Sequence, residues 1–452
     1  MGGTANLNIM KNLIYIFCLI TCLSYNSYSQ WNLNNMSSYR AQLQSARMID
    51  TIYFIGGTGN DISSTVDAYN TVSESWMPLS NISSPRCFTA SVGGDSALYV
   101  AGGLISFANP LVGSNVIDIY KNGVWSTDTL PDSIWAAAAV HVGSKILIAG
   151  GYISFSTSTN TPVVSKLVYV YDELTNSWTV DTLSEARGYP AVASDGVIAI
   201  FAGGHRGKNL PSDAVDIYNS VTGSWTAATL SEARAHVGGV YAGGKFYFAG
   251  GIRAGVGNSS DVIDIYDGTN WTVDHLSYSR GGIYPATAGD KIFFPGGGEM
   301  NLLQLYYRNS ESLVDVYDIT SASWSTNNMV FDKVNHTSLG YGSKIYVAGG
   351  AQIPGEILDA VEIWDVVTGV HFLNPFNKIS AYPNPASDLV TIEGIEDLPG
   401  FIDGEIINCY GSVVLKVTRI DGGIDVSNLS VGLYFLNIKY DKGTVTIKLV
   451  KE

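Results

Sequence analysis

The residues that most often carry enzymatic chemistry are few in this sequence, and their spacing is irregular. Its six histidines stand at positions 141, 205, 236, 275, 336 and 371, so none forms a His-x-x-x-His pair and no metal-ligand spacing recurs. The sequence also lacks a Gly-x-Ser-x-Gly turn for a nucleophilic serine and a glycine loop of the phosphate-binding kind. This pattern predicts no metal site, no cofactor and no catalytic residues.

Several polar and aromatic residues that could contact a ligand follow paired glycines. His205 and Arg206 come directly after one such pair, and the long segment 297–313 holds two tyrosines next to an arginine. Variable loops on a rigid scaffold often bind ligands, and an aromatic platform with a cation would suit a sugar face or a peptide. The alternative is that these side chains only pack or solvate their loops. The candidate ligand-binding residues are His205, Arg206, Arg253, Glu299, Tyr306, Tyr307 and Arg308.

The elements that must position these residues are internal repeats. Glycine pairs begin at positions 56, 102, 150, 203, 250, 296 and 349, which places them 46 to 53 residues apart. Sixteen residues before six of the seven pairs stands a cation, and a tryptophan follows most pairs after a strand such as "VDIY". The recurring framework residues are Arg40, Arg86, Arg187, Arg234, Arg280, Lys333, Trp31, Trp76, Trp125, Trp178, Trp225, Trp271 and Trp324.

The repeats predict an all-β fold. A run such as "KFYFAGG" is rich in aromatic residues, as expected of a strand that is buried on both faces. The glycines end that strand where the backbone bends and neighbouring segments approach closely. A period near 50 residues with several short strands per unit is typical of a β-propeller that has one repeat per blade.

The arginine, the paired glycines, the Tyr-Asp strand and the spaced tryptophan together resemble Kelch repeats over residues 31 to 374. The resemblance implies a seven-bladed Kelch-type β-propeller, which we assign to residues 30–375. Three positions depart from the pattern, namely Ile134 in place of arginine, Trp364 in place of tyrosine and His371 in place of tryptophan. These departures weaken the third and seventh repeats without changing their number.

The recurring cations allow two interpretations. Six cations at one repeat position in an acidic protein could form an anion-binding ring. However, a residue that recurs in every blade usually belongs to the framework, as an ion pair or a carbonyl contact between blades. The recurrent arginine of Kelch repeats is largely structural, so the resemblance also favours the framework interpretation.

Trp31 predicts how the ring of blades closes. It lies nine residues before Arg40, at the spacing that separates most tryptophans from the next repeat. We therefore expect residues 31 to 35 to complete the blade that begins at Lys333, because an unpaired edge strand is a liability. The alternative is that "VHFLN" (370 to 374) forms that strand and Trp31 merely packs nearby.

The net charge disfavours one class of partner, and the N-terminus predicts export. The net charge of −15 makes a nucleic-acid backbone an unfavourable partner. Lys11 precedes an apolar run over residues 13 to 23, and small residues stand at 27 and 29, so residues 1–29 read as a signal peptide. Eleven apolar residues are too few to span a bilayer, and the sequence predicts no transmembrane segment.

The composition changes near residue 376. Residues 376–452 predict about seven short alternating strands, which we interpret as a small immunoglobulin-like β-sandwich. Three motifs in order resemble the C-terminal sorting domain of type IX secretion substrates. The residues that carry this resemblance are Pro383, Asn384, Pro385, Gly432, Tyr434 and Lys448. The resemblance implies export by the outer-membrane type IX machinery of a Bacteroidota-type cell, and a secreted or cell-surface location. The alternative is an ordinary immunoglobulin-like adhesive domain.

Two functions remain open at this stage. In the first, the propeller is an exported module that binds a glycan or a protein. In the second, it is a carbohydrate-active enzyme resembling sialic-acid mutarotase or galactose oxidase, two activities known on Kelch propellers. The oxidase needs a Cys-Tyr crosslink, two histidines and a second tyrosine, for which Cys87 and His205 or His236 are the available material. The mutarotase needs a placed acid and base, and His205, Arg206 and Glu299 are the candidates.

Overall fold

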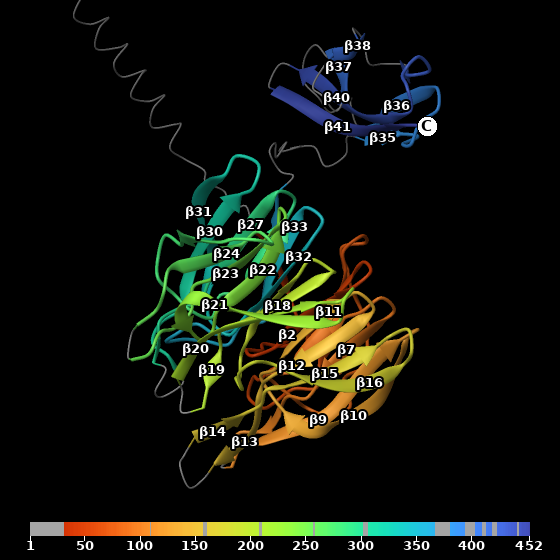
Figure 1. Cartoon of the computed structure of the whole chain (residues 1–452). Helices are drawn as coiled ribbons and strands as arrows, with labels where there is room; N and C mark the ends of the chain where they lie inside the picture. Colours follow the sequence, from red (N-terminus) through yellow and green to blue (C-terminus); the bar gives the residue numbers. More distant parts are fainter. Residues whose placement is uncertain are drawn as a thin grey trace, which may run out of the picture. The chain divides into compact units, whose positions relative to one another are not determined.

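The computed structural model divides the chain into two compact units, Met1–Val366 and Val367–Glu452. It describes residues 31–108, 110–156, 161–207, 210–255, 258–301, 306–366, 380–393, 403–408, 413–417, 423–440 and 443–452. All regular elements in these ranges are β-strands (Figure 1). None of the described residues belongs to a helix long and apolar enough to cross a membrane.

Among its described residues, the first unit contains seven antiparallel sheets of four or more strands. In the order of pairing they are β2 (Gln44–Met48), β3 (Thr51–Ile55), β4 (Val66–Asn70) and β5 (Ser75–Met77); β6 (Ala90–Gly93), β7 (Ala97–Ala101), β9 (Val112–Lys121) and β10 (Val124–Ile134); β11 (Ala138–Val142), β12 (Lys145–Ala149), β15 (Leu167–Asp172) and β16 (Ser177–Thr182); β17 (Ala191–Ser194), β18 (Ile198–Ala202), β20 (Leu210–Asn219) and β21 (Ser224–Arg234); β22 (Gly238–Ala242), β23 (Lys245–Ala249), β24 (Val262–Tyr266) and β25 (Trp271–His275); β26 (Ala286–Ala288), β27 (Lys291–Pro295), β30 (Glu311–Asp318) and β31 (Ser323–Lys333); and β32 (Thr337–Tyr341), β33 (Lys344–Ala348), β34 (Ala360–Asp365) and β1 (Trp31–Asn35).

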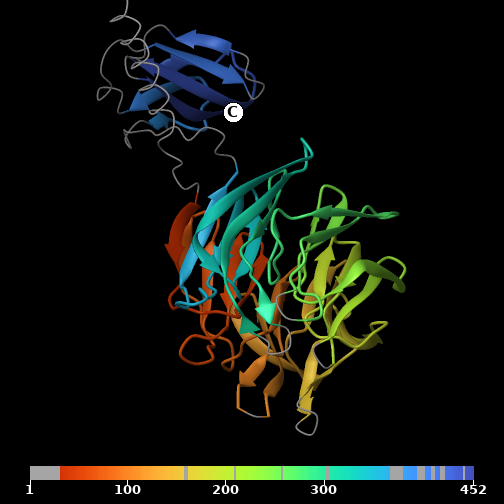
Figure 2. The same ribbon diagram turned by 90° about the vertical axis from the view of Figure 1, so that its left-hand side faces the viewer.

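Six shorter strands lie in the loops that follow the glycine pairs. They are β8 (Leu104–Ser106), β13 (Tyr152–Ser156), β14 (Thr161–Val164), β19 (His205–Arg206), β28 (Met300–Asn301) and β29 (Tyr306–Tyr307). Figure 2 shows the orange and yellow loops of the second and third repeats projecting beyond the strands of their sheets. The rim on the side of the glycine pairs is therefore uneven, because the length of these loops differs between repeats.

The sheets follow one another in a closed succession. The first strands contact in the order β2, β6, β11, β17, β22, β26, β32 and again β2. The second strand of each sheet supplies most of the core; β3, with sequence TIYFI, is buried at every residue. Apolar clusters then form between neighbouring sheets, as where Phe54 and Tyr346 pack together. Burial between sheets thus explains why these strands are apolar on both faces.

The N-terminal strand closes this succession. Strand β1 pairs antiparallel with β34, with Trp31 opposite Trp364, and their rings lie edge to face with centroids 5.1 Å apart. The position of Trp31 in the sequence predicted this pairing. The competing strand over residues 370 to 374 lies outside the described residues, as does His371.

The glycine pairs allow successive repeats to approach each other closely. Gly56 and Gly57 have φ of 59° and 100°, in the left-handed region that favours glycine. A Cβ atom on Gly56 would lie 2.3 Å from the carbonyl oxygen of Arg86, and one on Gly349 would lie 2.3 Å from that of Arg40. Any side chain at these positions would push neighbouring repeats apart.

The second unit contains a three-stranded and a four-stranded antiparallel sheet among its described residues. The first consists of β35 (Ser380–Tyr382), β36 (Leu389–Glu393) and β39 (Ile424–Asp425), and the second of β38 (Val413–Val417), β37 (Asp403–Asn408), β40 (Gly432–Tyr440) and β41 (Gly443–Lys451). They share a core that includes Val390, Ile406 and Leu436.

The three sorting motifs of the second unit meet around its last strand. Gly432 pairs with Lys451 at one end of the β40–β41 ladder, and Lys448 pairs with Phe435 along it. The side chain of Asn384 accepts a hydrogen bond from the backbone of Val450 at 2.9 Å. The Tyr434 hydroxyl donates to the carbonyl oxygen of Ser430 at 2.9 Å.

Candidate functional site

A ring of residues in left-handed backbone conformation surrounds the centre of the first unit. Each stands two positions after the framework residue of its repeat, and φ lies between 49° and 67°. We call them the ring residues: Gln42, Phe88, Ala136, Tyr189, His236, Gly282 and Asn335. This conformation is unfavourable for residues other than glycine, so the surrounding structure must hold it.

Backbone hydrogen bonds between repeats hold the ring residues. The amide of Phe88 donates to the carbonyl of Gln42 at 3.2 Å, and the amide of Ala136 donates to that of Phe88 at 2.9 Å. Tyr189 donates to Ala136 in the same way, also at 2.9 Å. The backbone is therefore constant around the ring, whereas the side chains differ in every repeat. Such an arrangement can carry specificity without altering the fold.

Five ring residues line a cavity of about 380 Å³ on the side of the glycine pairs, which we call the mouth cavity. The loops of several repeats supply the rest of its wall. Its lining residues are Gln42, Phe88, Leu104, Phe107, Leu111, Trp135, Tyr152, Phe155, Pro162, Tyr189, His236, Met300, Tyr307, Asn335 and Ile353. Most of them are aromatic or aliphatic, and no Asp, Glu, Lys or Arg occurs among them.

A second cavity of about 340 Å³ borders the ring and is lined mainly by residues of the first strands of the sheets. It shares Phe88, Tyr189 and His236 with the mouth cavity. These three side chains therefore stand between the two cavities. The rings of Tyr189 and His236 lie with centroids 4.8 Å apart, and those of Phe88 and Tyr189 with centroids 5.7 Å apart.

Two histidines lie together beside the mouth cavity, and both are neutral near pH 7. The rings of His205 and His236 lie edge to face with centroids 5.0 Å apart. Burial lowers the pKa of His236 to about 4, although the ring keeps some accessible surface because it borders the cavities. Burial, followed by the neighbouring His236, holds the pKa of His205 well below its ordinary value.

Several buried polar atoms near this cavity have no hydrogen-bond partner among the described residues. They are the Tyr152 hydroxyl, Gln42 Oε1, His236 Nε2 and both ring nitrogens of His205. Tyr152 is only 4% exposed, and burial raises the pKa of its hydroxyl, which keeps it protonated. Unsatisfied buried polar atoms are rare in proteins, so these atoms would gain a hydrogen-bond partner if a small side-chain movement exposed them to a ligand or water in the mouth cavity.

Arg206 and Arg253, two of the candidates, occupy equivalent positions in consecutive repeats and are paired with glutamates. Arg253 Nε donates to Glu232 at 2.7 Å, and Arg206 Nη1 lies 3.4 Å from Glu185. Each glutamate also accepts a bond from a serine hydroxyl of its own repeat, which is Ser212 for Glu185 at 2.5 Å. These contacts explain why the stretch that begins "SEAR" occurs twice in the sequence.

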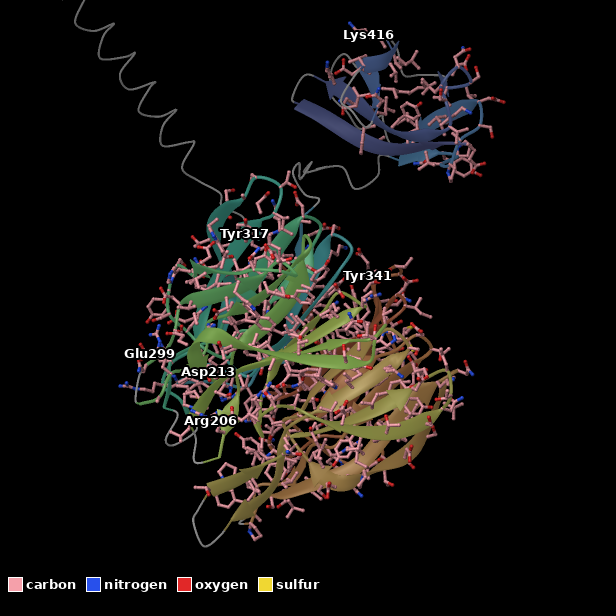
Figure 3. The ribbon with its side chains drawn as sticks, viewed as in Figure 1. Arg206, Asp213, Glu299, Tyr317, Tyr341 and Lys416 are labelled. Atoms are coloured by element: carbon pink, nitrogen blue, oxygen red, sulfur yellow. The ribbon has the colours of Figure 1, made fainter. Side chains whose placement is uncertain are left out.

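The remaining candidates lie on the sixth repeat and are divided between surface and interior. Arg308 Nη1 lies 4.0 Å from Glu299 Oε2, and both side chains are partly exposed. Figure 3 shows Glu299 and Arg206 at the periphery of the first unit. Tyr307 is only 7% exposed and lines the mouth cavity, so it does not form an outward platform. The side chain of Tyr306 lies outside the described residues.

The six framework cations are buried and bind carboxylates. Arg234 ends β21, but its guanidinium pairs with Asp264 in the next sheet. Lys333 Nζ lies 2.8 Å from Glu362, with both side chains fully buried. Burial lowers the pKa of Arg86 to about 10, which still leaves it charged at neutral pH. The other pairs are Arg40–Asp67, Arg86–Asp118, Arg187–Asp216 and Arg280–Asp315. These cations hold sheets together and do not face either cavity.

One cluster of possible metal ligands occurs among the described residues. His141 Nε2 lies 3.3 Å from Glu173 and 3.6 Å from Asp95, at the ends of the sheets away from the glycine pairs. Glu173 also accepts hydrogen bonds from the Tyr99 hydroxyl and the Asp95 amide. The three side chains thus contact one another and Tyr99 directly, with no ion in the structure.

The candidate residues from sequence therefore include only part of the mouth cavity. Tyr307 lines it, and His205 contacts the rings of Tyr152 and Tyr189 at centroid distances of 6.4 and 5.9 Å. Trp135, Tyr152 and the ring residues apart from His236 were not predicted from the sequence. A signal for the ring existed, since its residues follow the cation position at a fixed spacing and change type in each repeat.

Comparisons with known proteins identify parts of both units. A family model described as "Secretion system C-terminal sorting domain" matches residues 380–452, and one described as "Kelch motif" matches residues 136–180. Kelch-like protein 38 of Rattus norvegicus is 28% identical over 140 residues, which cover 30% of this chain and 24% of the relative. Beta-agarase D of Zobellia galactanivorans is 36% identical over 77 residues, which cover 17% of this chain and 15% of the relative.

The chain thus spans a quarter or less of the length of these two relatives. A solved structure titled "Structure of YjhT" covers 65% of this chain and 99% of its own, with a TM-score of 0.51 and 16% sequence identity. At this identity the likeness concerns the fold.

Proposed function

Since the chain carries Kelch repeats and a C-terminal secretion sorting domain, we propose that it is an exported binding module for a glycan or a protein. The ligand enters the mouth cavity. The observation that carries this proposal is a largely apolar cavity whose wall holds buried polar atoms without partners among the described residues. Cavities of this size and composition are typical of ligand sites.

The domain organisation belongs to the same proposal. Residues 1–29 are a signal peptide, residues 30–375 a seven-bladed propeller and residues 376–452 an immunoglobulin-like sandwich that the type IX machinery of a Bacteroidota-type cell handles. The closed succession of seven sheets supports the blade count. Two antiparallel sheets around one core support the sandwich.

The test is a binding screen with a cavity variant. The full chain is applied to arrays of immobilised glycans and to extracts of surface proteins, beside Trp135→Ala and Trp125→Ala. Trp135 lines the mouth cavity, whereas Trp125 lines neither cavity and controls for loss of a tryptophan. We expect Trp135→Ala alone to lose at least tenfold in affinity. Equal binding by all three proteins would place the ligand elsewhere and contradict the proposal.

A carbohydrate-active enzyme is the second candidate function. It is favoured by the meeting of His205, His236 and Tyr152 with Cys87, which packs in the same apolar cluster as Tyr152. However, a general base works best when its pKa lies near the operating pH, and the pKa of His236 is about 4. Burial also raises the pKa of the Cys87 thiol to about 12, which makes it a poor nucleophile.

The enzyme hypothesis has a separate test. Anomerically pure sugars are mixed with the full chain and followed by NMR, and peroxide release from galactose is measured in parallel with added copper. A rate that exceeds the blank and disappears in His236→Phe would support the enzyme. A rate equal to the blank would leave the binding module as the function.

A further inference from the structure

The wall of the mouth cavity restricts the charge of its ligand. Among the described residues that line it there is no Asp, Glu, Lys or Arg, and the lining histidine is neutral near pH 7. The nearby arginines of the framework are already bound to buried carboxylates. An anionic group that entered this cavity would lose its hydration without gaining a counter-ion, and a cation would regain only the attraction of the ring faces. The ligand group that fits best is therefore uncharged.

The aromatic side chains of the wall form a continuous surface. Trp135 and Tyr152 lie with ring centroids 5.7 Å apart, Tyr152 and Tyr189 also 5.7 Å apart, and Tyr189 reaches Phe88 at the same distance. Aromatic rings prefer partners at such centroid distances, either offset or edge to face. A further planar ring placed against this surface would continue the same packing.

The apolar surface extends to the rim. Phe107 lies in the loop of the second repeat and is 51% exposed. Phe107 also lines the mouth cavity. Exposed apolar residues that adjoin an apolar cavity typically mark a binding surface.

The described lining residues that carry polar side-chain atoms are Gln42, Trp135, Tyr152, Tyr189, His236, Tyr307 and Asn335. Of these atoms, Gln42 Oε1, the Tyr152 hydroxyl and His236 Nε2 are buried and have no partner among the described residues. These can satisfy one or two hydrogen-bonding groups of a ligand. A sugar ring carries a hydroxyl on nearly every carbon, and most of those hydroxyls would face apolar side chains here and lose their hydrogen bonds.

We propose that the mouth cavity binds an uncharged aromatic ring that carries one hydrogen-bonding substituent, such as a phenol. This inference rests on the proposed binding function and assigns its ligand class. The ring packs against Trp135, Tyr152 and Phe88, and its substituent bonds to the Tyr152 hydroxyl or to His236 Nε2. The ring belongs to an aromatic side chain of a protein partner, and a free aromatic compound is the alternative source that the last comparison separates.

Four probes test the ligand class on the full chain by saturation-transfer NMR and calorimetry. They are 4-methylphenol, toluene, 4-hydroxyphenylacetate and methyl β-galactoside. We expect 4-methylphenol to bind, toluene to bind several-fold more weakly, and the charged and the sugar probes to bind at least tenfold more weakly. Preferential binding of the galactoside to the cavity would overturn the ligand class and leave the proposed function intact.

Two variants locate the probe. Tyr152→Phe keeps the ring and removes only the hydroxyl. We therefore expect it to lower the affinity for 4-methylphenol several-fold and to leave the affinity for toluene unchanged. Trp135→Ala is expected to weaken both probes at least tenfold, whereas Trp125→Ala changes neither. Thermal unfolding is used to check that each variant is folded. If Trp135→Ala is not folded, Tyr152→Phe alone tests whether the probe binds in the mouth cavity. The inference would be overturned if the aromatic probes bound both cavity variants as tightly as the unmodified chain, or if they did not bind the folded unmodified chain.

A last comparison separates the two sources of the ring. N-acetyltyrosinamide and short peptides with a central tyrosine are measured against 4-methylphenol. At least tenfold tighter binding of the peptides indicates a protein partner, because contacts of the flanking residues with the rim add to the affinity. Equal binding indicates a free aromatic compound. If no small probe binds while the screen finds a ligand sensitive to Trp135→Ala, only the aromatic inference fails.

Discussion

The third repeat shows, at the scale of residues, what the buried ion pairs require. There the cation is replaced by Ile134 and the carboxylate by Tyr169, whose hydroxyl donates to Asp132 at 2.8 Å. In the other repeats the carboxylate also accepts a hydrogen bond from the backbone amide three residues before the cation. In the fourth repeat, for example, the Ser184 amide donates to Asp216. The third repeat has Pro131 at that position, which has no amide hydrogen to satisfy. All three partners have therefore changed together.

Because the three partners changed together, introducing the same three residues into the fourth repeat should preserve its stability better than changing the cation alone. Arg187→Ile alone leaves Asp216 as a buried unpaired carboxylate and is expected to lower the free energy of unfolding by about 3 to 5 kcal/mol. Adding Ser184→Pro and Asp216→Tyr recreates the third repeat, with Glu185 in the place of Asp132. We expect this triple variant to recover more than half of the loss in denaturant unfolding. A triple variant no more stable than Arg187→Ile would show that the surrounding packing, and not the pairing of these side chains, determines the stability of this site.

His336 provides a pH-dependent prediction. It is 1% exposed, and burial, followed by the charge of Lys333, lowers its pKa to about 3. Between about pH 6.5 and pH 3 the unfolded chain binds a proton that the native protein does not, so stability falls as the pH falls through this window. On going from pH 7 to pH 4, the unmodified chain should lose about 3 kcal/mol more than His336→Gln. Parallel losses in urea unfolding would contradict the low pKa.

At the scale of elements, the closing strand decides whether the ring of sheets is complete. Trp31 is 4% exposed and packs in one cluster with Phe293 and Trp364, although it begins the described chain and its partner strand ends the first unit. Without β1, the outer edge of β34 would be left unpaired. The N-terminal strand therefore connects the two ends of the repeat array.

Trp31→Ala is expected to lower the free energy of unfolding by about 3 to 5 kcal/mol, the usual cost of truncating a large buried aromatic side chain. Leu33→Ala is the matched control, because Leu33 lies in the same strand and is 52% exposed. The measurement is the midpoint of thermal unfolding for both variants. Equal midpoints would mean that the closing strand contributes little to stability.

At the scale of the whole molecule, the proposed binding site and the sorting domain belong to different units. The mouth cavity lies within the first unit, and the sorting-domain match covers residues 380–452 in the second. The net charge of −15 disfavours association with polyanions. The sorting domain can therefore be deleted without changing a residue of the mouth cavity, and the cavity can be mutated without changing the sorting domain.

Deleting residues 376–452 tests this separation. In the cell, we expect the truncated chain to stay in the periplasm, because the sorting motifs are lost, while the propeller remains folded and keeps its ligand. Cell fractions are probed by immunoblot, and the purified truncated chain is examined by circular dichroism. Appearance of the truncated chain in the medium at the normal level would contradict the sorting assignment.

Much of this protein follows from local sequence pattern alone. The glycine pairs, the apolar strands and the closing role of Trp31 were predictable because strand periodicity and tight turns act within one repeat and recur seven times. The Kelch and sorting resemblances are confirmed for the same reason, since both reside in short motifs at fixed spacing. The framework role of the cations was the favoured expectation, and their burial beside carboxylates agrees with it.

The mouth cavity was decided only by the tertiary structure. Gln42 comes from the first repeat, Trp135 and Tyr152 from the third and His236 from the fifth, so no spacing along the chain brings them together. Closure of the ring of sheets turns one backbone position per repeat toward a common centre. Tyr307, expected at the surface, is buried there because its loop folds over the ring. Convergence of distant residues depends on closure, and closure is a property of all the repeats together.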